Sequence, residues 1–133
     1  MKIVIETVPH NKQPYDTAGE YWRDGAGTLH IQVSETGDDW FNSLIGLHEW
    51  VEVMLMERRG IKLIDSNNFD IPFEKERAEG KHGPNDEPGD DPRCPYQNEH
   101  LMASGVEQIV CSALGIKWKD YGEAVGKLDY AAD

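Results

Sequence analysis

Cysteine is scarce in this chain, and long apolar runs are missing altogether. Only two of the 133 residues are cysteine, Cys94 and Cys111, which is too few for a disulfide scaffold. No segment approaches the roughly 20 apolar residues that cross a bilayer, and the N-terminus lacks the apolar run and cleavage site of a secretory signal. These absences exclude secreted disulfide-rich and membrane-spanning classes, and we expect a cytoplasmic protein.

Positive charge is scarce as well. Thirteen Lys and Arg face 25 Asp and Glu, which gives a formal net charge of -12. Because this acidity repels nucleic-acid phosphates and anionic lipids, we expect neither direct nucleic-acid binding nor a membrane partner. The motifs GxGxxG, GxxxxGK[ST] and GxSxG are also missing, so dinucleotide-binding, P-loop and serine-hydrolase functions lack support.

The length and the 38% hydrophobic content are those of one folded domain over residues 1–133. Alternating side chains predict three short strands, over residues 2–8, 20–22 and 28–33. Three- and four-residue spacing predicts two long helices, from Asp38 or Asp39 to Arg58 and from Pro95 to Gly115. The predicted fold class is α+β, with a small antiparallel sheet of about three strands packed on these two helices.

Shorter elements complete the prediction. A helix is expected from Asp65 or Ser66 to about Arg77, with Pro72 in or near its first turn. Residues 80–95 are rich in proline, glycine and acidic side chains, a composition typical of an exposed loop. A terminal helix is expected over residues 119–130.

The first long helix carries the sharpest chemical signal, the segment His48-Glu49-Trp50-Val51-Glu52. Side chains four residues apart on a helix lie on one side, so His48 and Glu52 can share a divalent ion. Glu49 would lie beside the ion, where a carboxylate can take a proton from a water held there. His48 and Glu52 also share an apolar face, and a carboxylate on such a face needs a partner.

The second long helix repeats this conflict, because His100 and Glu107 interrupt its apolar stripe. If the two helices pack antiparallel, these residues meet His48 and Glu52 near mid-length. We therefore predict a metal site formed by His48, Glu52 and His100, with Glu107 as a fourth ligand or as a partner of a ligating histidine. A buried His-Glu network without metal and a solvated helix edge are the two alternatives.

The segment His48-Glu49-x-x-Glu52 resembles the zincin HExxH motif with glutamate in place of the second histidine. Together with the ETVPH strand and the DDPRCPYQNEH segment, it is also similar to small phage and prophage proteins of unknown function. The zincin resemblance implies that His48 and Glu52 are ligands and that Glu49 is the general base. The phage resemblance implies that the protein works in the host cytoplasm.

The function expected from these signals is that of a metal-dependent hydrolase, zincin-like and of peptidase type, acting on a small substrate or peptide that the sequence does not name. Zinc is the first choice of metal, and manganese and iron are the alternatives. The competing hypothesis is a non-catalytic accessory protein with a structural metal or His-Glu cluster. Its acidic surface would bind a basic host or virion protein.

Six further side chains are weaker candidates. Asp70 and Glu74 could approach the site, although an acidic helix face in water is the commoner arrangement. His10 and His30 belong to the strand region and are expected at the surface. Tyr15 and Tyr96 could donate hydrogen bonds to a bound oxyanion, or anchor loops. The acidic loop 85–91 lacks the ligand spacing of an EF-hand and is expected to be solvated.

Overall fold

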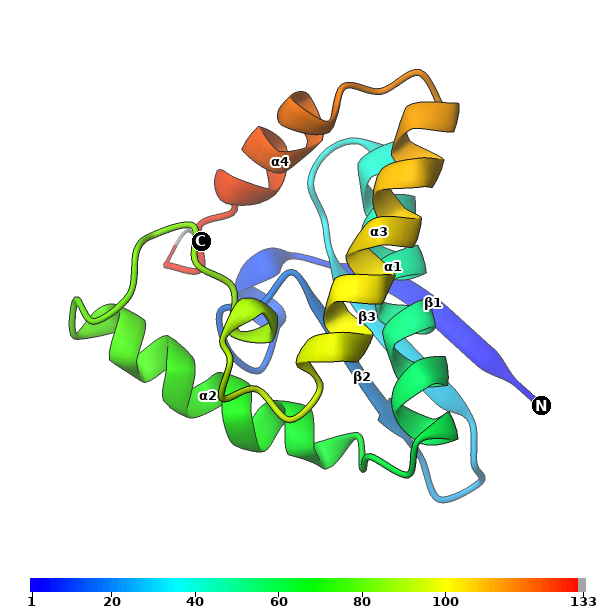
Figure 1. The fold of residues 1–133 in the computed structure, drawn as a ribbon. Coiled ribbons are helices and arrows are strands. Elements are labelled where there is room, and N and C mark those ends of the chain that lie inside the picture. The colour runs from blue at the N-terminus through cyan, green and yellow to red at the C-terminus, as the bar shows by residue number, and fades with distance from the viewer. Residues whose placement is uncertain (132–133) are drawn as a thin grey trace.

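The computed structural model describes residues 1–131, in which a three-stranded sheet packs against helices (Figure 1). The strands are β1 (Ile3–Val8), β2 (Gly19–Arg23) and β3 (Leu29–Ser34), in the order β1-β3-β2. The α+β class is confirmed, but the sheet is mixed and not wholly antiparallel, because β1 runs parallel to β3. The reason is that the connection after β1 crosses β3, so that β2 pairs with the opposite edge.

The first long helix, α1 (Asp39–Arg58), has the bounds that the sequence predicts. The Asp38 side chain caps it by accepting hydrogen bonds from the backbone N–H groups of Trp40 and Phe41. Gly60, at a φ of 76°, follows the helix end. Gly46 lets α1 pack closely on the sheet, since a Cβ there would lie 3.1 Å from a side-chain carbon of Ile5.

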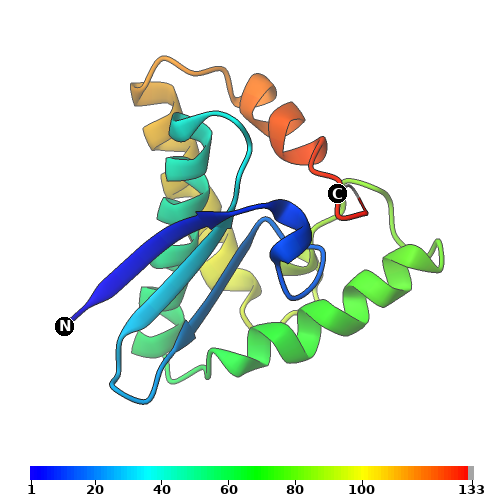
Figure 2. The same cartoon turned by 180° about the vertical axis from the view of Figure 1, so that it is seen from behind.

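The second long helix, α3 (Gln97–Ala113), runs antiparallel beside α1, as predicted. Figure 2 shows the pair from behind, with the sheet in front of them. The terminal helix α4 (Trp118–Gly126) is shorter than predicted and leaves Leu128 outside it. Its Tyr121 is buried and contacts Phe41 near the start of α1, with the ring centroids 5.6 Å apart.

Helix α2 (Ile64–Ala78) differs from its prediction in the place of Pro72, which lies in the interior and not in the first turn. Proline removes the hydrogen bond to the carbonyl four residues earlier, here that of Asn68. Both residues are exposed, so water can satisfy this carbonyl. Burial of Phe73 and Asp70 on the opposite side fixes the helix across the interruption.

The predicted loop 80–95 is mostly exposed, but it is more ordered than its composition indicates. It contains a 3-10 turn, η2 (Pro88–Asp90), and buries Gly89 and Cys94. A second 3-10 turn, η1 (His10–Lys12), follows β1. No helix within residues 1–131 is long and apolar enough to span a membrane.

Candidate metal centre

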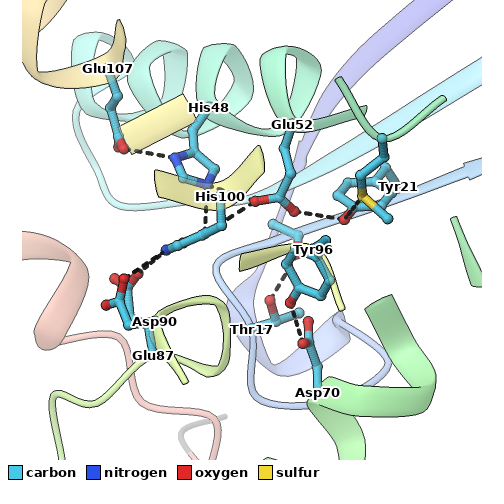
Figure 3. Close-up of polar contacts among 12 residues, drawn as sticks. Thr17, Tyr21, His48, Glu52, Asp70, Glu87, Asp90, Tyr96, His100 and Glu107 are labelled. Carbon is cyan, nitrogen blue, oxygen red and sulfur yellow. Dashed lines mark hydrogen bonds and ion pairs between the residues drawn. The ribbon is translucent and has the colours of Figure 1, made fainter. Parts of the chain in front are cut away.

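Three donor atoms from α1 and α3 converge between the two helices (Figure 3). His48 Nε2 lies 3.1 Å from Glu52 Oε2, which lies 3.1 Å from His100 Nδ1. The third side of this triangle, from His48 Nε2 to His100 Nδ1, measures 3.2 Å. All three side chains are buried. The structure thus brings together the three residues that the sequence predicts as ligands.

The triangle has the dimensions of a tetrahedral metal site. Ligand atoms about 2.0–2.1 Å from a zinc ion, at tetrahedral angles, are roughly 3.3 Å apart. The measured separations of 3.1–3.2 Å between donor atoms agree with this value. A single cation placed between the two ring nitrogens and the carboxylate oxygen could accept a lone pair from all three donors. The donor set of two imidazoles and one carboxylate also fits zinc.

Glu107 lies outside the triangle, on the other ring nitrogen of His48. Its Oε1 is 2.9 Å from His48 Nδ1, and its second oxygen accepts a hydrogen bond from the Tyr121 hydroxyl. A carboxylate in this place keeps the proton on Nδ1 and leaves Nε2 free to bind a metal. Of the two roles predicted for Glu107, the geometry therefore favours the partner of a ligating histidine.

His100 has a comparable arrangement on its own outer nitrogen. Its Nε2 lies 3.0 Å from Glu87 and 3.4 Å from Asp90, both of the 80–95 segment. Gly89 between them packs against the imidazole. The loop 85–91, expected to be solvated, thus holds the ring of a candidate ligand. The contacts of Glu87 and Asp90 were not predicted, because the composition of an acidic segment rich in proline and glycine does not indicate whether it faces water or a histidine.

Tyr21 of β2 supports the third ligand. Its hydroxyl donates to Glu52 Oε1 at 2.6 Å, so the other carboxylate oxygen is left for the metal. Burial alone would raise the pKa of Glu52, but hydrogen bonds from His100 and His48 outweigh it and lower that pKa to about 2. Sequence patterns place Tyr21 in a strand and do not indicate its contact with Glu52.

The same contacts act on the two imidazoles. Burial opposes the charged form of each ring, but hydrogen bonds to carboxylates outweigh it. Glu107 and Glu52 raise the pKa of His48 well above its usual value, and Glu52 and Glu87 raise that of His100 to about 10. In the absence of metal the centre therefore holds protons, and a divalent ion would replace them.

Glu49 extends from α1 towards β2, beside the triangle. A Cβ placed on Gly19 would lie 2.5 Å from Glu49 Oε1, so the absence of a side chain at position 19 makes room for this carboxylate. Burial raises the pKa of Glu49 well above its usual value, and the nearby charge of Glu52 adds to the rise. The predicted general base is thus a half-buried carboxyl group next to the candidate ligands.

Asp70 of α2 is buried, contrary to the expectation of a solvated acidic face. It accepts hydrogen bonds from the hydroxyls of Tyr15, at 3.1 Å, and of Tyr96. Both tyrosines are therefore engaged with Asp70 and anchor the segments on either side of α2. Glu74, the other candidate on this helix, pairs with Arg77 at 2.8 Å and does not join the cluster.

The two remaining histidines lie elsewhere. His10 is buried and not at the surface as expected, because its ring contacts Ser34 Oγ at 2.8 Å and Asp16 at 2.9 Å. His30 is half-buried, stacks on Trp22 and contacts Asp24 at 2.8 Å. The structure places neither ring at the centre.

Comparisons with known proteins do not add to this geometry. No family model, curated protein or solved structure matches the chain. The resemblance to phage proteins and to zincins therefore stays a prediction. The chemistry of the centre therefore rests on its own side chains.

Gly89 offers a test of how His100 is positioned. A Cβ at position 89 would lie 2.2 Å from His100 Cγ, too close for any real contact. We expect Gly89→Ala to displace the imidazole and to weaken zinc binding about 10- to 100-fold, the range typical of changes that support a ligand. Competition with a chromophoric chelator measures this affinity. Gly105→Ala is the matched control, because a Cβ at position 105 would meet open space. Equal zinc affinity of the two variants would contradict the prediction.

The burial of Asp70 predicts that the stability of the fold depends on pH. Burial is the main cause that raises its pKa from 3.8 to about 7. Because the folded chain then holds this proton more tightly than the unfolded chain, the stabilisation is complete below about pH 4 and is lost as pH rises through 7. Each pKa unit corresponds to about 1.4 kcal/mol, so the effect amounts to a few kcal/mol.

Asp70→Asn stays uncharged at every pH and should lose this dependence. Urea unfolding in chelator from pH 4.5 to 8 should show the variant gaining stability relative to the native chain as pH rises. Tyr96→Phe, which removes a hydrogen bond that favours the Asp70 carboxylate, should move the transition to higher pH. Parallel curves for the native chain and Asp70→Asn would contradict this assignment.

Proposed function

We propose that this protein binds one divalent metal ion, with zinc as the first choice, through His48, Glu52 and His100, and that it is a metal-dependent hydrolase. The observation that carries the proposal is the triangle of donor atoms with sides of 3.1–3.2 Å. Structural zinc sites have four protein ligands, whereas catalytic sites have three and keep a position open. Three protein ligands therefore favour catalysis.

Each neighbouring side chain has a role in this proposal. A bound divalent ion polarises a carbonyl or a related bond and lowers the pKa of water. Glu49 would accept the proton of the attacking water and pass it to the leaving group. Glu107 and Tyr21 orient the ligands His48 and Glu52, respectively. The room left by Gly19 lets the Glu49 carboxyl group lie close to the candidate ligands.

The direct experiment combines metal analysis with activity. We expect the purified protein to hold about one equivalent of zinc and to hydrolyse members of a panel of peptide and ester substrates. Chelation should abolish the hydrolysis, and zinc should restore it. Protein prepared in zinc that retains no metal after desalting, and that binds none in titration, would contradict the proposal.

A structural role for the metal is the second candidate, because the burial of all three ligands favours it. In that case the protein would be a non-catalytic accessory protein, and its acidic surface would bind a basic partner. Chelation distinguishes the two functions. A structural metal predicts a large loss of melting temperature with no hydrolysis at any stage, whereas a catalytic metal predicts loss of hydrolysis while the chain stays folded.

A further inference from the structure

The outward sides of α1 and α3 carry an unusual number of exposed apolar side chains. Ile109 of α3 is 70% exposed, Met102 is 57% exposed, and Trp40 of α1 is 61% exposed. These two helices are antiparallel neighbours (Figure 1), and helical spacing puts the exposed apolar residues of each on one side, away from the buried histidines. We call this surface the α1–α3 face. It consists of Trp40, Leu47, Val51, Met54, Met102, Val106 and Ile109.

The α1–α3 face also lacks charge. The two carboxylates of α3, Glu99 and Glu107, are both buried, so this helix, all of which the structure describes, exposes no ionised side chain. The exposed charged residues of α1 lie at the ends of the helix and are Asp39, Glu57 and Arg58. In a chain that is 29% charged, with a net charge of -12, a neutral face two helices wide differs sharply from its surroundings.

The exposed apolar area of the α1–α3 face is close to the area that one partner buries in a protein–protein interface. Its large side chains would each cover about 200 Å² if fully exposed, so their exposed fractions leave on the order of 600 Å² of apolar surface. One partner in a stable protein complex contributes about 800 Å². The face therefore reaches the upper limit for a free surface on a monomer and approaches what a dimer needs.

We propose that the α1–α3 face binds the same face of a second copy of this chain, forming a symmetric dimer with four helices at its centre. The charge pattern favours this occupant. A basic partner would be attracted to the acidic remainder of the surface and not to a neutral face. Two copies, each with a net charge of -12, repel one another least when their neutral faces meet, and there apolar burial can hold them together.

Light scattering after size-exclusion chromatography tests the proposal with the full chain. One copy has a mass of 15.0 kDa, so we expect about twice that mass at micromolar concentration. Ile109→Glu should shift the mass to that of one copy. Ile71→Glu, on the exposed side of α2, is the matched control and should leave the dimer intact.

Met102→Lys provides a second route if Ile109→Glu fails to fold. Lysine has a flexible apolar stem like that of methionine, and at a position 57% exposed it leaves the monomer's core unchanged. It too should give single copies, with zinc binding unchanged because no ligand is altered. A native chain that stays monomeric at 100 μM or about that concentration would overturn the proposal. So would a dimer that survives both variants, or binding of the native monomer to neutral lipid vesicles through Ile109.

Discussion

Glu49→Gln is expected to lower hydrolytic turnover about 100- to 10,000-fold, the contribution of a positioned general base. Glutamine has nearly the shape of glutamate, so it fits the space against Gly19, but it cannot accept the proton. Because Glu49 is not one of the three converging donors, zinc should stay bound with its stoichiometry unchanged. Steady-state kinetics on an active substrate, together with metal analysis of the same sample, measures both effects.

Two further variants sharpen this test. Gly19→Ala should displace the Glu49 carboxylate and reduce turnover in the same direction, without a change at position 49 itself. Glu57→Gln is the control. It changes another glutamate of α1, one whose exposed ion pair is with Arg23 of β2, and it should retain full activity. A Glu49→Gln protein with native turnover would exclude Glu49 as the base.

Alanine at His48, Glu52 or His100 is expected to abolish stoichiometric zinc binding, with an affinity loss of more than about 100-fold for each. Each substitution removes one corner of a triangle whose sides are all 3.1–3.2 Å, so the two remaining donors can no longer complete the set. Isothermal titration of metal-free protein measures the loss. Circular dichroism of the same samples shows whether the helices persist.

Glu107→Gln is the informative comparison, because Glu107 contacts His48 at its outer nitrogen and the Tyr121 hydroxyl, and lies outside the three converging donors. It should weaken zinc binding about 10- to 100-fold and keep one equivalent at saturation. If Glu107→Gln removed the metal as completely as His48→Ala does, Glu107 would be a ligand and the three-residue centre would be wrong.

The long helices could be predicted from the sequence because their signals are local. Asp38 caps α1, Gly60 follows it, and the apolar spacing between them is regular. The direction of β1 could not be predicted, since pairing with β3 depends on a connection that crosses the sheet. The place of Pro72 in α2 was wrongly predicted for a related reason. Burial of Phe73 keeps α2 continuous, and no local pattern reports that burial.

The candidate centre also combines residues that local spacing predicts with residues that it does not. His48 and Glu52 are four residues apart, so helix geometry alone places them together, and His100 follows if two amphipathic helices pack antiparallel. The partners Tyr21 and Glu87 come from a strand and a loop, whose contacts depend on the tertiary structure. Sequence spacing could therefore identify the candidate ligands and Glu107 on the facing helix, but not Tyr21 and Glu87.

The separation of the candidate ligands along the chain would make a bound metal a removable cross-link. Glu52 and His100 are 48 residues apart, and α2 and η2 lie in the loop that they would close. Because closing a loop of that length costs the unfolded chain considerable entropy, the ion would stabilise most strongly what lies inside it. Zinc availability would then control local opening of α2 and η2, while the sheet, which precedes the loop, would remain paired.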